Sequence, residues 1–187
     1  RYGQLGAFYP GVRAKAAPGY LTERMDLLQQ ALANAFGVTG GANLVECNFS
    51  VVTTPPGELS VLQRLPHFDS TDPSSLAVLH YLCGPEHGGT AFYRHRATGF
   101  ETVSASRLED YSQVMEAEAQ RGAAPQAGYL RGDTPLFEQT YRVEAAFNRL
   151  VIYRGWTLHS GTVPDGHSLS PDPRMGRLTI NTFLQVP

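Results

Sequence analysis

Three residues of this chain have the side chains and the spacing of a metal site. His67 and Asp69 stand two positions apart, and His159 follows much later, just after a strand-like run. Side chains alternate between the two faces of an extended segment, so His67 and Asp69 project to one side while Phe68 packs on the other. Two histidines and one carboxylate can bind one face of an octahedral ion and leave positions for a chelating cosubstrate and dioxygen. The pattern indicates redox chemistry at non-haem iron, with these three ligands as the catalytic centre.

Most of the chain is predicted to be β-structure. Runs rich in β-branched, aromatic and other apolar residues indicate strands, and clusters of Gly and Pro separate these runs. The predicted strands span 44–53, 61–69, 76–82, 90–95, 149–153 and 177–184. Many short strands with turn signals between them favour a sandwich or a jelly roll.

Two helices are predicted beside these strands. Apolar residues recur at helical spacing over 21–36, and Gly37 ends that helix. A second helix is predicted over 107–120, because Ser106 and Glu109 form a capping-box pattern ahead of an apolar face. We expect the second helix to buttress a sheet.

Length and composition fit one domain. The chain has 187 residues, of which 42% are hydrophobic, so it can bury a substantial core, and no second domain is evident. We expect a single domain over 1–187, in which 1–43 form a helical amino-terminal extension packed on the core.

Charge and cysteine content limit the partners and the compartment. The formal net charge of −2 offers no basic surface, so neither nucleic acid nor a membrane is expected as a partner. No apolar run approaches the roughly 20 residues that cross a bilayer. Cys47 and Cys83 are too few for a disulfide framework, which favours a reduced, cytoplasmic setting. The expected partner is a small-molecule or peptide substrate, and the oligomeric state stays open.

The segment over 66–92 resembles the prolyl hydroxylase branch of the 2-oxoglutarate and Fe(II)-dependent dioxygenases. The resemblance rests on the sequence PHFD at 66–69, on LAVLHYLCGPEHGGTAF at 76–92 and on LHSG at 158–161. It implies a mainly β fold with flanking helices, namely a double-stranded β-helix, which is a jelly roll of the cupin type. It also implies that His67, Asp69 and His159 bind iron.

The same resemblance implies a set of residues that bind the cosubstrate. In that family a basic residue on a strand after the distal histidine binds the far carboxylate of 2-oxoglutarate. Arg177 matches that residue, Thr179 on the same strand face can add a hydroxyl, and Tyr81 matches a tyrosine that often contacts the same carboxylate. A planar guanidinium can hold a carboxylate through two parallel hydrogen bonds. The implied activity is hydroxylation of a small molecule or an amino-acid or peptide side chain, with release of succinate and CO2.

Two departures from the family pattern bear on the pocket. Family members commonly have an aromatic residue three positions before the first histidine, whereas Arg64 stands there in this chain, so a rebuilt cosubstrate pocket is expected. A Pro-containing segment over 162–176 separates His159 from Arg177 and can cover the metal site. Arg174 in that segment competes with Arg177 for the carboxylate, but Arg177 opens a strand-like run and is preferred.

Two other hypotheses fit the same residues. A cupin-like metalloenzyme would use the triad without 2-oxoglutarate, and the role of Arg177 separates it from the dioxygenase. A metal-free jelly-roll binding module would use the triad as polar packing, and the absence of stoichiometric metal would favour it.

Overall fold

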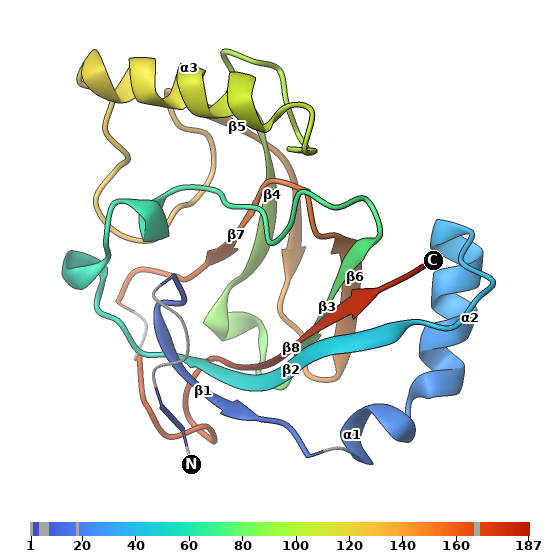
Figure 1. The fold of residues 1–187 in the computed structure, drawn as a ribbon. Helices are drawn as coiled ribbons and strands as arrows, with labels where there is room; N and C mark the ends of the chain where they lie inside the picture. Colours follow the sequence, from blue (N-terminus) through green and yellow to red (C-terminus); the bar gives the residue numbers. More distant parts are fainter. Residues whose placement is uncertain (1, 4–7, 18, 167–168) are drawn as a thin grey trace.

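A computed structural model describes residues 2–3, 8–17, 19–166 and 169–187 of the protein. Over these residues the fold is mainly β, with two antiparallel sheets and few helices (Figure 1). The sequence therefore predicted the fold class correctly at this level.

The larger sheet has five strands in the order β1-β2-β8-β3-β6. Their bounds are Gly11–Lys15 for β1, Asn43–Val52 for β2, Leu178–Gln185 for β8, Ser75–Tyr81 for β3 and Arg149–Arg154 for β6. Every residue of β3 is buried, which explains its nearly continuous apolar sequence. Strand β8 comes last in the chain but lies between β2 and β3 (Figure 1), so it brings the segment after Arg177 to the centre of the sheet.

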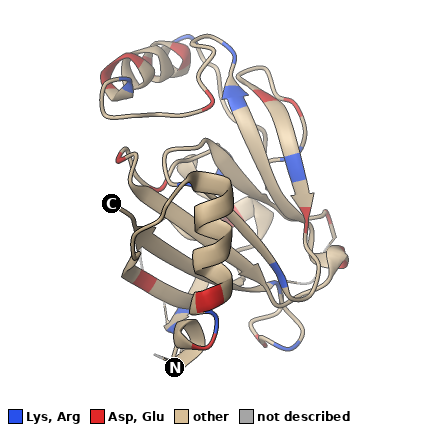
Figure 2. Ribbon diagram, turned by 90° about the vertical axis from the view of Figure 1, so that its right-hand side faces the viewer, with Lys and Arg blue, Asp and Glu red and all other residues tan. Residues whose placement is uncertain are grey.

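The smaller sheet has three strands in the order β5-β4-β7. Their bounds are Phe137–Glu144 for β5, Gly89–His95 for β4 and His159–Thr162 for β7. Figure 2 shows basic and acidic residues close together on this part of the molecule. The ion pairs there are Arg94–Glu101, Arg94–Glu138 and Arg142–Glu144. Its surface therefore carries charges of both signs.

Helices cover the outer parts of both sheets (Figure 1). The α-helices are α1 (Gly19–Thr22), α2 (Met25–Phe36) and α3 (Leu108–Gln120), and the 3₁₀ turns are η1 (Pro56–Glu58), η2 (Leu62–Arg64) and η3 (Pro85–His87). Leu28 and Leu32 of α2 pack against Leu76 and Val78 of β3, while Tyr111 of α3 belongs to the core beside the smaller sheet. None of the helices in the described part of the chain has the length and apolar content to cross a membrane.

Both predicted helices are found at the predicted positions, but their amino-terminal ends differ from the prediction. Helix α2 ends before Gly37, whose φ of 68° is in the left-handed region that favours glycine. The predicted capping box is wrong, because no side chain caps α3 and the Ser106 hydroxyl pairs with that of Ser104 at 2.9 Å. The amino-terminal extension over 1–43 also contains a strand, β1, which pairs with β2.

The strand predictions for β2, β3, β4, β6 and β8 are confirmed within one or two residues. The predicted strand over 61–69 is wrong, since the segment forms η2 and then a single bridge between His67 and His159. Pro66 has no N–H to donate, and the Arg64 and Leu65 N–H groups bond carbonyls of the local turn at 3.2 and 3.4 Å. These groups therefore cannot pair with a neighbouring strand.

Two adjacent glycines allow close approach of the chain beside the smaller sheet. Gly88 has a φ of 86°, and a Cβ there would lie 1.8 Å from the Thr162 carbonyl oxygen. A Cβ at Gly89 would lie 2.1 Å from the Val143 carbonyl oxygen. Both positions thus have a steric requirement for glycine.

We expect Gly88→Ala to lower the free energy of unfolding by about 3 kcal/mol, because it adds backbone strain and a steric clash. Urea denaturation followed by circular dichroism measures this change. Gly57→Ala is the control, since its Cβ would have open space around it and its stability should change little. A Gly88→Ala protein as stable as the Gly57→Ala protein would contradict the steric argument.

Candidate metal centre

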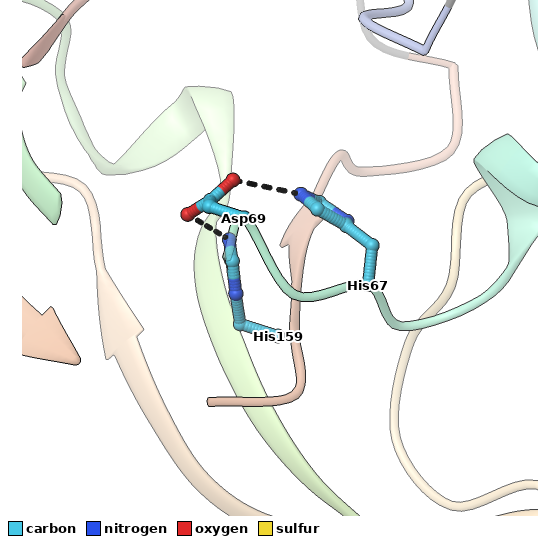
Figure 3. A group of neighbouring side chains, drawn as sticks. All are labelled: His67, Asp69 and His159. Carbon is cyan, nitrogen blue, oxygen red and sulfur yellow. Dashed lines mark ion pairs between the residues drawn. The ribbon is translucent and has the colours of Figure 1, made fainter. Parts of the chain in front are cut away.

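His67, Asp69 and His159 meet at one point of the structure (Figure 3). One potential ligand atom from each lies within 4.8 Å of the others. His67 Nε2 is 3.8 Å from Asp69 Oδ1, and His159 Nε2 is 3.6 Å from Asp69 Oδ2. The three side chains thus form a group that can hold a metal ion, as their spacing predicted.

Main-chain hydrogen bonds fix the two histidines opposite each other. The His67 N–H donates to the His159 carbonyl at 2.9 Å, and the His159 N–H donates to the His67 carbonyl at 2.8 Å. The Asp69 N–H donates to the Gly155 carbonyl at 2.7 Å. Phe68 packs edge-on against Tyr111, with ring centres 6.2 Å apart. The segment is not a regular strand, but this pairing still lets His67 and Asp69 face one ion.

The ring of His159 is held in the tautomer that a metal ligand needs. Its Nδ1 lies 2.8 Å from the Thr157 carbonyl oxygen, and since a carbonyl only accepts, Nδ1 must carry the proton. The Nε2 atom is left with a lone pair that faces Asp69 and the Tyr153 hydroxyl, which is 3.1 Å away. A hydrogen bond of this kind on the second ring nitrogen is usual at histidines that bind metals.

The surroundings favour uncharged histidines. Burial lowers the pKa of His159 to about 4. Burial and the neighbouring His159 lower the pKa of His67 to about 4. The His67 side chain is nevertheless 55% accessible, because it lines the cavity. Burial also raises the pKa of Asp69, against the opposing effects of His67 and Arg13. Neutral imidazoles are the form that binds metals, so the two histidines are ready as ligands at neutral pH.

The triad opens into a cavity of about 700 Å³. Both sheets contribute to its wall, through Leu79 of β3 and Asn181 of β8 on one side and Thr90 of β4 and Gly161 of β7 on the other. This volume is typical of a site for small molecules.

Arg177 lines the same cavity as the triad. Its side chain is buried, its Nη2 donates to the Gly89 carbonyl at 2.7 Å, and its guanidinium carbon lies 5.7 Å from the centre of the Tyr81 ring. Its Nε atom is buried and has no hydrogen-bond partner among the described residues. A buried guanidinium with a donor left over can bind an anionic group.

The other residues predicted to bind the cosubstrate lie behind the wall. Tyr81 and Thr179 are buried and opposite each other in the β3–β8 pairing, but neither is among the described residues that line the cavity. The Tyr81 hydroxyl bonds the Thr90 hydroxyl at 2.6 Å, and the Thr179 hydroxyl donates to Asn181 Oδ1 at 2.8 Å. The two hydroxyl groups therefore bond residues that line the cavity, Thr90 and Asn181.

Two features that the sequence linked to the pocket contribute little to its described wall. Arg64 does not line the cavity, because its Nη2 donates to the Leu59 carbonyl at 2.6 Å in the preceding turn. Within the segment 162–176, Val163 alone of the described residues lines the cavity, while 167–168 lie outside the described residues. Arg174 in that segment is 86% exposed and pairs with Asp172 at 2.8 Å. Arg177 is therefore the arginine of this region that reaches the site.

Two residues of the site were not predicted. Tyr153, at the end of a predicted strand, lies beside His159, and burial raises its pKa well above the ordinary value. Arg13 lines the cavity from β1, a strand that had no apolar run to reveal it. Alternation along 149–153 could have pointed to Tyr153, whereas nothing near Arg13 in the sequence pointed to the site.

Comparison with known proteins gives a family and a distant similarity to solved structures. The model of a family described as "Family of unknown function (DUF6445)" matches residues 1–184. Among curated proteins no sequence matches the chain. A solved structure described as "Crystal Structure of EvdMO1" is similar with a TM-score of 0.47 and 16% sequence identity. The match covers 99% of this chain and 40% of that one, so the chain spans less than half of that protein's length.

Proposed function

Because the chain belongs to DUF6445, a family of unknown function, we propose its function from its own site. We propose a non-haem Fe(II) and 2-oxoglutarate-dependent dioxygenase that hydroxylates a small molecule or an amino-acid or peptide side chain. The observation that carries this proposal is the presence of the two-histidine, one-carboxylate group and the buried Arg177 in one cavity.

His67, Asp69 and His159 would hold the iron. Two neutral imidazoles and one carboxylate are the ligand set of non-haem Fe(II) sites that keep open positions, so the residues present fit this ion. When bound, Fe(II) supplies the redox chemistry that couples dioxygen to the conversion of 2-oxoglutarate into succinate and CO2. The Thr157 carbonyl orients the His159 ring, and the backbone pairing of His67 with His159 fixes the distance between the two ligands.

Arg177 would hold the far carboxylate of 2-oxoglutarate. Its hydrogen bond to the Gly89 carbonyl fixes one side of the guanidinium and leaves the unpartnered Nε side for a ligand. Thr90 and Asn181, which line the cavity nearby, add polar groups. Apolar residues of the wall, such as Val52, Leu79 and Phe183, limit the access of water and so strengthen these hydrogen bonds.

We also propose that the two sheets form a double-stranded β-helix. From β3 onward the chain runs through β4 and β5 of the smaller sheet, β6 of the larger, β7 of the smaller and β8 of the larger. Such repeated passage between two antiparallel sheets is typical of jelly rolls.

Anaerobic titration of the Fe(II)-loaded protein with 2-oxoglutarate tests the proposed function. We expect a visible metal-to-ligand charge-transfer band at one equivalent, and succinate on admission of dioxygen and a substrate. Fe(II) binding without this band would favour a metalloenzyme that does not use 2-oxoglutarate. Absence of stoichiometric Fe(II) would favour a binding module.

A further inference from the structure

A second arginine, Arg13 of β1, lines the cavity that contains the triad and Arg177. Its Nε atom is buried and has no hydrogen-bond partner in the described part of the chain. Its guanidinium carbon lies 4.4 Å from the centre of the Tyr9 ring, and no described carboxylate forms an ion pair with it. Arg13 is therefore a cation in the cavity wall without a carboxylate partner among the described residues, which makes it a second position for an anionic group.

The two arginines reach the cavity from different parts of the chain, Arg13 from β1 and Arg177 from the residue before β8. Besides the larger effect of burial, the charge of Arg13 lowers the pKa of both His67 and Asp69. The charge of Arg177 instead opposes the effect of burial on the pKa of Tyr81 and Tyr153. Both charges also oppose the effect of burial on the pKa of Tyr9, so both guanidinium groups lie near this residue. What separates the two arginines is their attachment, because Arg13 extends from β1 at the edge of the larger sheet, whereas Arg177 precedes β8 and bonds the Gly89 carbonyl of β4.

If the site held Fe(II) and 2-oxoglutarate, the charge of Arg13 would have no counter-charge within it. A divalent iron ion and Arg177 together balance Asp69 and a doubly charged 2-oxoglutarate. Arg13 then adds one positive charge to the cavity. Glu116 also lines the cavity, but it lies on α3 and is exposed to solvent. A partly buried charge without a partner is unfavourable, so a ligand with one negative charge would stabilise this arrangement.

The wall between the triad and solvent is mainly apolar on the side of η2 and α3. The apolar and aromatic residues there that line the cavity are Leu62, Leu65, Phe68, Leu108, Tyr111 and Met115. Leu62 is 58% exposed and Leu108 is 39% exposed, so this apolar surface reaches the outside of the protein. An apolar group in this position would remove that surface from water.

Resting on the proposed function, we propose that the substrate is an amphipathic carboxylic acid. Arg13 binds the carboxylate of the substrate, and the apolar body of the substrate lies between η2 and α3. The carboxylate thereby fixes the substrate at the β1 edge of the cavity, while Arg177 holds the cosubstrate. Arg13 is then the residue that determines specificity for acids.

Calorimetry with two matched pairs of probes tests this inference. The probes are 4-phenylbutyrate and octanoate, with 4-phenylbutanamide and octanamide as their uncharged partners. They are titrated anaerobically into Fe(II)-loaded protein, with and without 2-oxoglutarate, so that binding is measured without turnover. We expect at least one acid to bind about tenfold or more tightly than its amide, as hydrogen bonds to a charged group imply. Arg13→Gln should remove this difference and leave the affinity for 2-oxoglutarate nearly unchanged.

Lys15→Gln is the matched control, because Lys15 lies two residues along the same strand and carries the same charge, but does not line the cavity. It should bind acids and amides as the wild-type protein does, and circular dichroism checks that Arg13→Gln is folded. The inference is overturned if no acid is preferred over its amide by the wild-type protein. It is also overturned if Arg13→Gln loses 2-oxoglutarate as Arg177→Gln does. A wild-type protein that binds no 2-oxoglutarate refutes the proposed function instead.

Discussion

Replacing Asp69 by Asn is expected to weaken Fe(II) binding by about a hundredfold or more. Asp69 is the anionic member of the triad, and its two oxygens face His67 and His159 at 3.8 and 3.6 Å. Changes to residues that merely orient metal ligands typically reduce metal affinity about 10- to 100-fold, so loss of the charged ligand should reduce it more. Anaerobic calorimetry with Fe(II) and metal analysis after gel filtration measure the effect. His67→Ala should behave in the same way.

The same variant separates loss of the site from loss of the fold. Burial raises the pKa of Asp69, so ionisation of this carboxyl is less favourable in the folded, metal-free protein than in the unfolded chain and lowers stability at pH values above its ordinary pKa. Asp69→Asn without metal should therefore have a melting temperature at neutral pH no lower than that of the wild-type protein. Asp110→Ala, which removes an exposed carboxylate on α3, is the control for metal binding. Fe(II) binding by Asp69→Asn at wild-type affinity would rule out the triad as the metal site.

Replacing Arg177 by Gln is expected to weaken 2-oxoglutarate binding by about 30- to 4000-fold, while Fe(II) still binds. Removal of one member of a buried, hydrogen-bonded charge pair costs about 2–5 kcal/mol, which corresponds to such a factor. Gln keeps an N–H group that can donate to the Gly89 carbonyl, so the buried acceptor need not lose its partner. Titration with 2-oxoglutarate, followed by the visible charge-transfer band of the Fe(II)-loaded protein, measures the affinity.

Arg174→Gln is the matched control for this variant. Arg174 stands three residues earlier, is exposed and pairs with Asp172, so its removal should leave 2-oxoglutarate binding unchanged. If Arg177→Gln retains wild-type affinity for 2-oxoglutarate, Arg177 is not the carboxylate ligand. The metalloenzyme that works without 2-oxoglutarate would then be the better account of the site.

The sequence was most informative where burial determines residue type. Strand β3 is buried along its whole length, and α2 has one apolar face, so both gave clear patterns. Strand β5 has the sequence FEQTYRVE, in which polar residues predominate, and β7 has the short sequence HSGT, so neither had an apolar run. Hydrogen bonding to β4 places both strands in the smaller sheet. Pairing of this kind depends on the folded chain and cannot be read from local composition.

The site shows the same division. The ligand set could be predicted because His67 and Asp69 need only local extension, and His159 was the best candidate for the third ligand. Tyr81 and Thr179 were placed near the cosubstrate from the family pattern, but their hydroxyls bond Thr90 and Asn181 within the wall. Side-chain direction at the end of a strand depends on neighbours in both sheets. Local sequence does not specify those neighbours.

The reciprocal backbone hydrogen bonds of His67 and His159 bear on how the proposed metal site would load an ion. A site built on a loose loop loses conformational entropy when it captures a metal, and it disorders again on release. Here the two ligand residues are already paired through their main chains at 2.9 and 2.8 Å. The ordering of this segment is completed when the protein folds. We therefore expect the proposed site to keep its shape without metal and to load an ion without a preceding folding step.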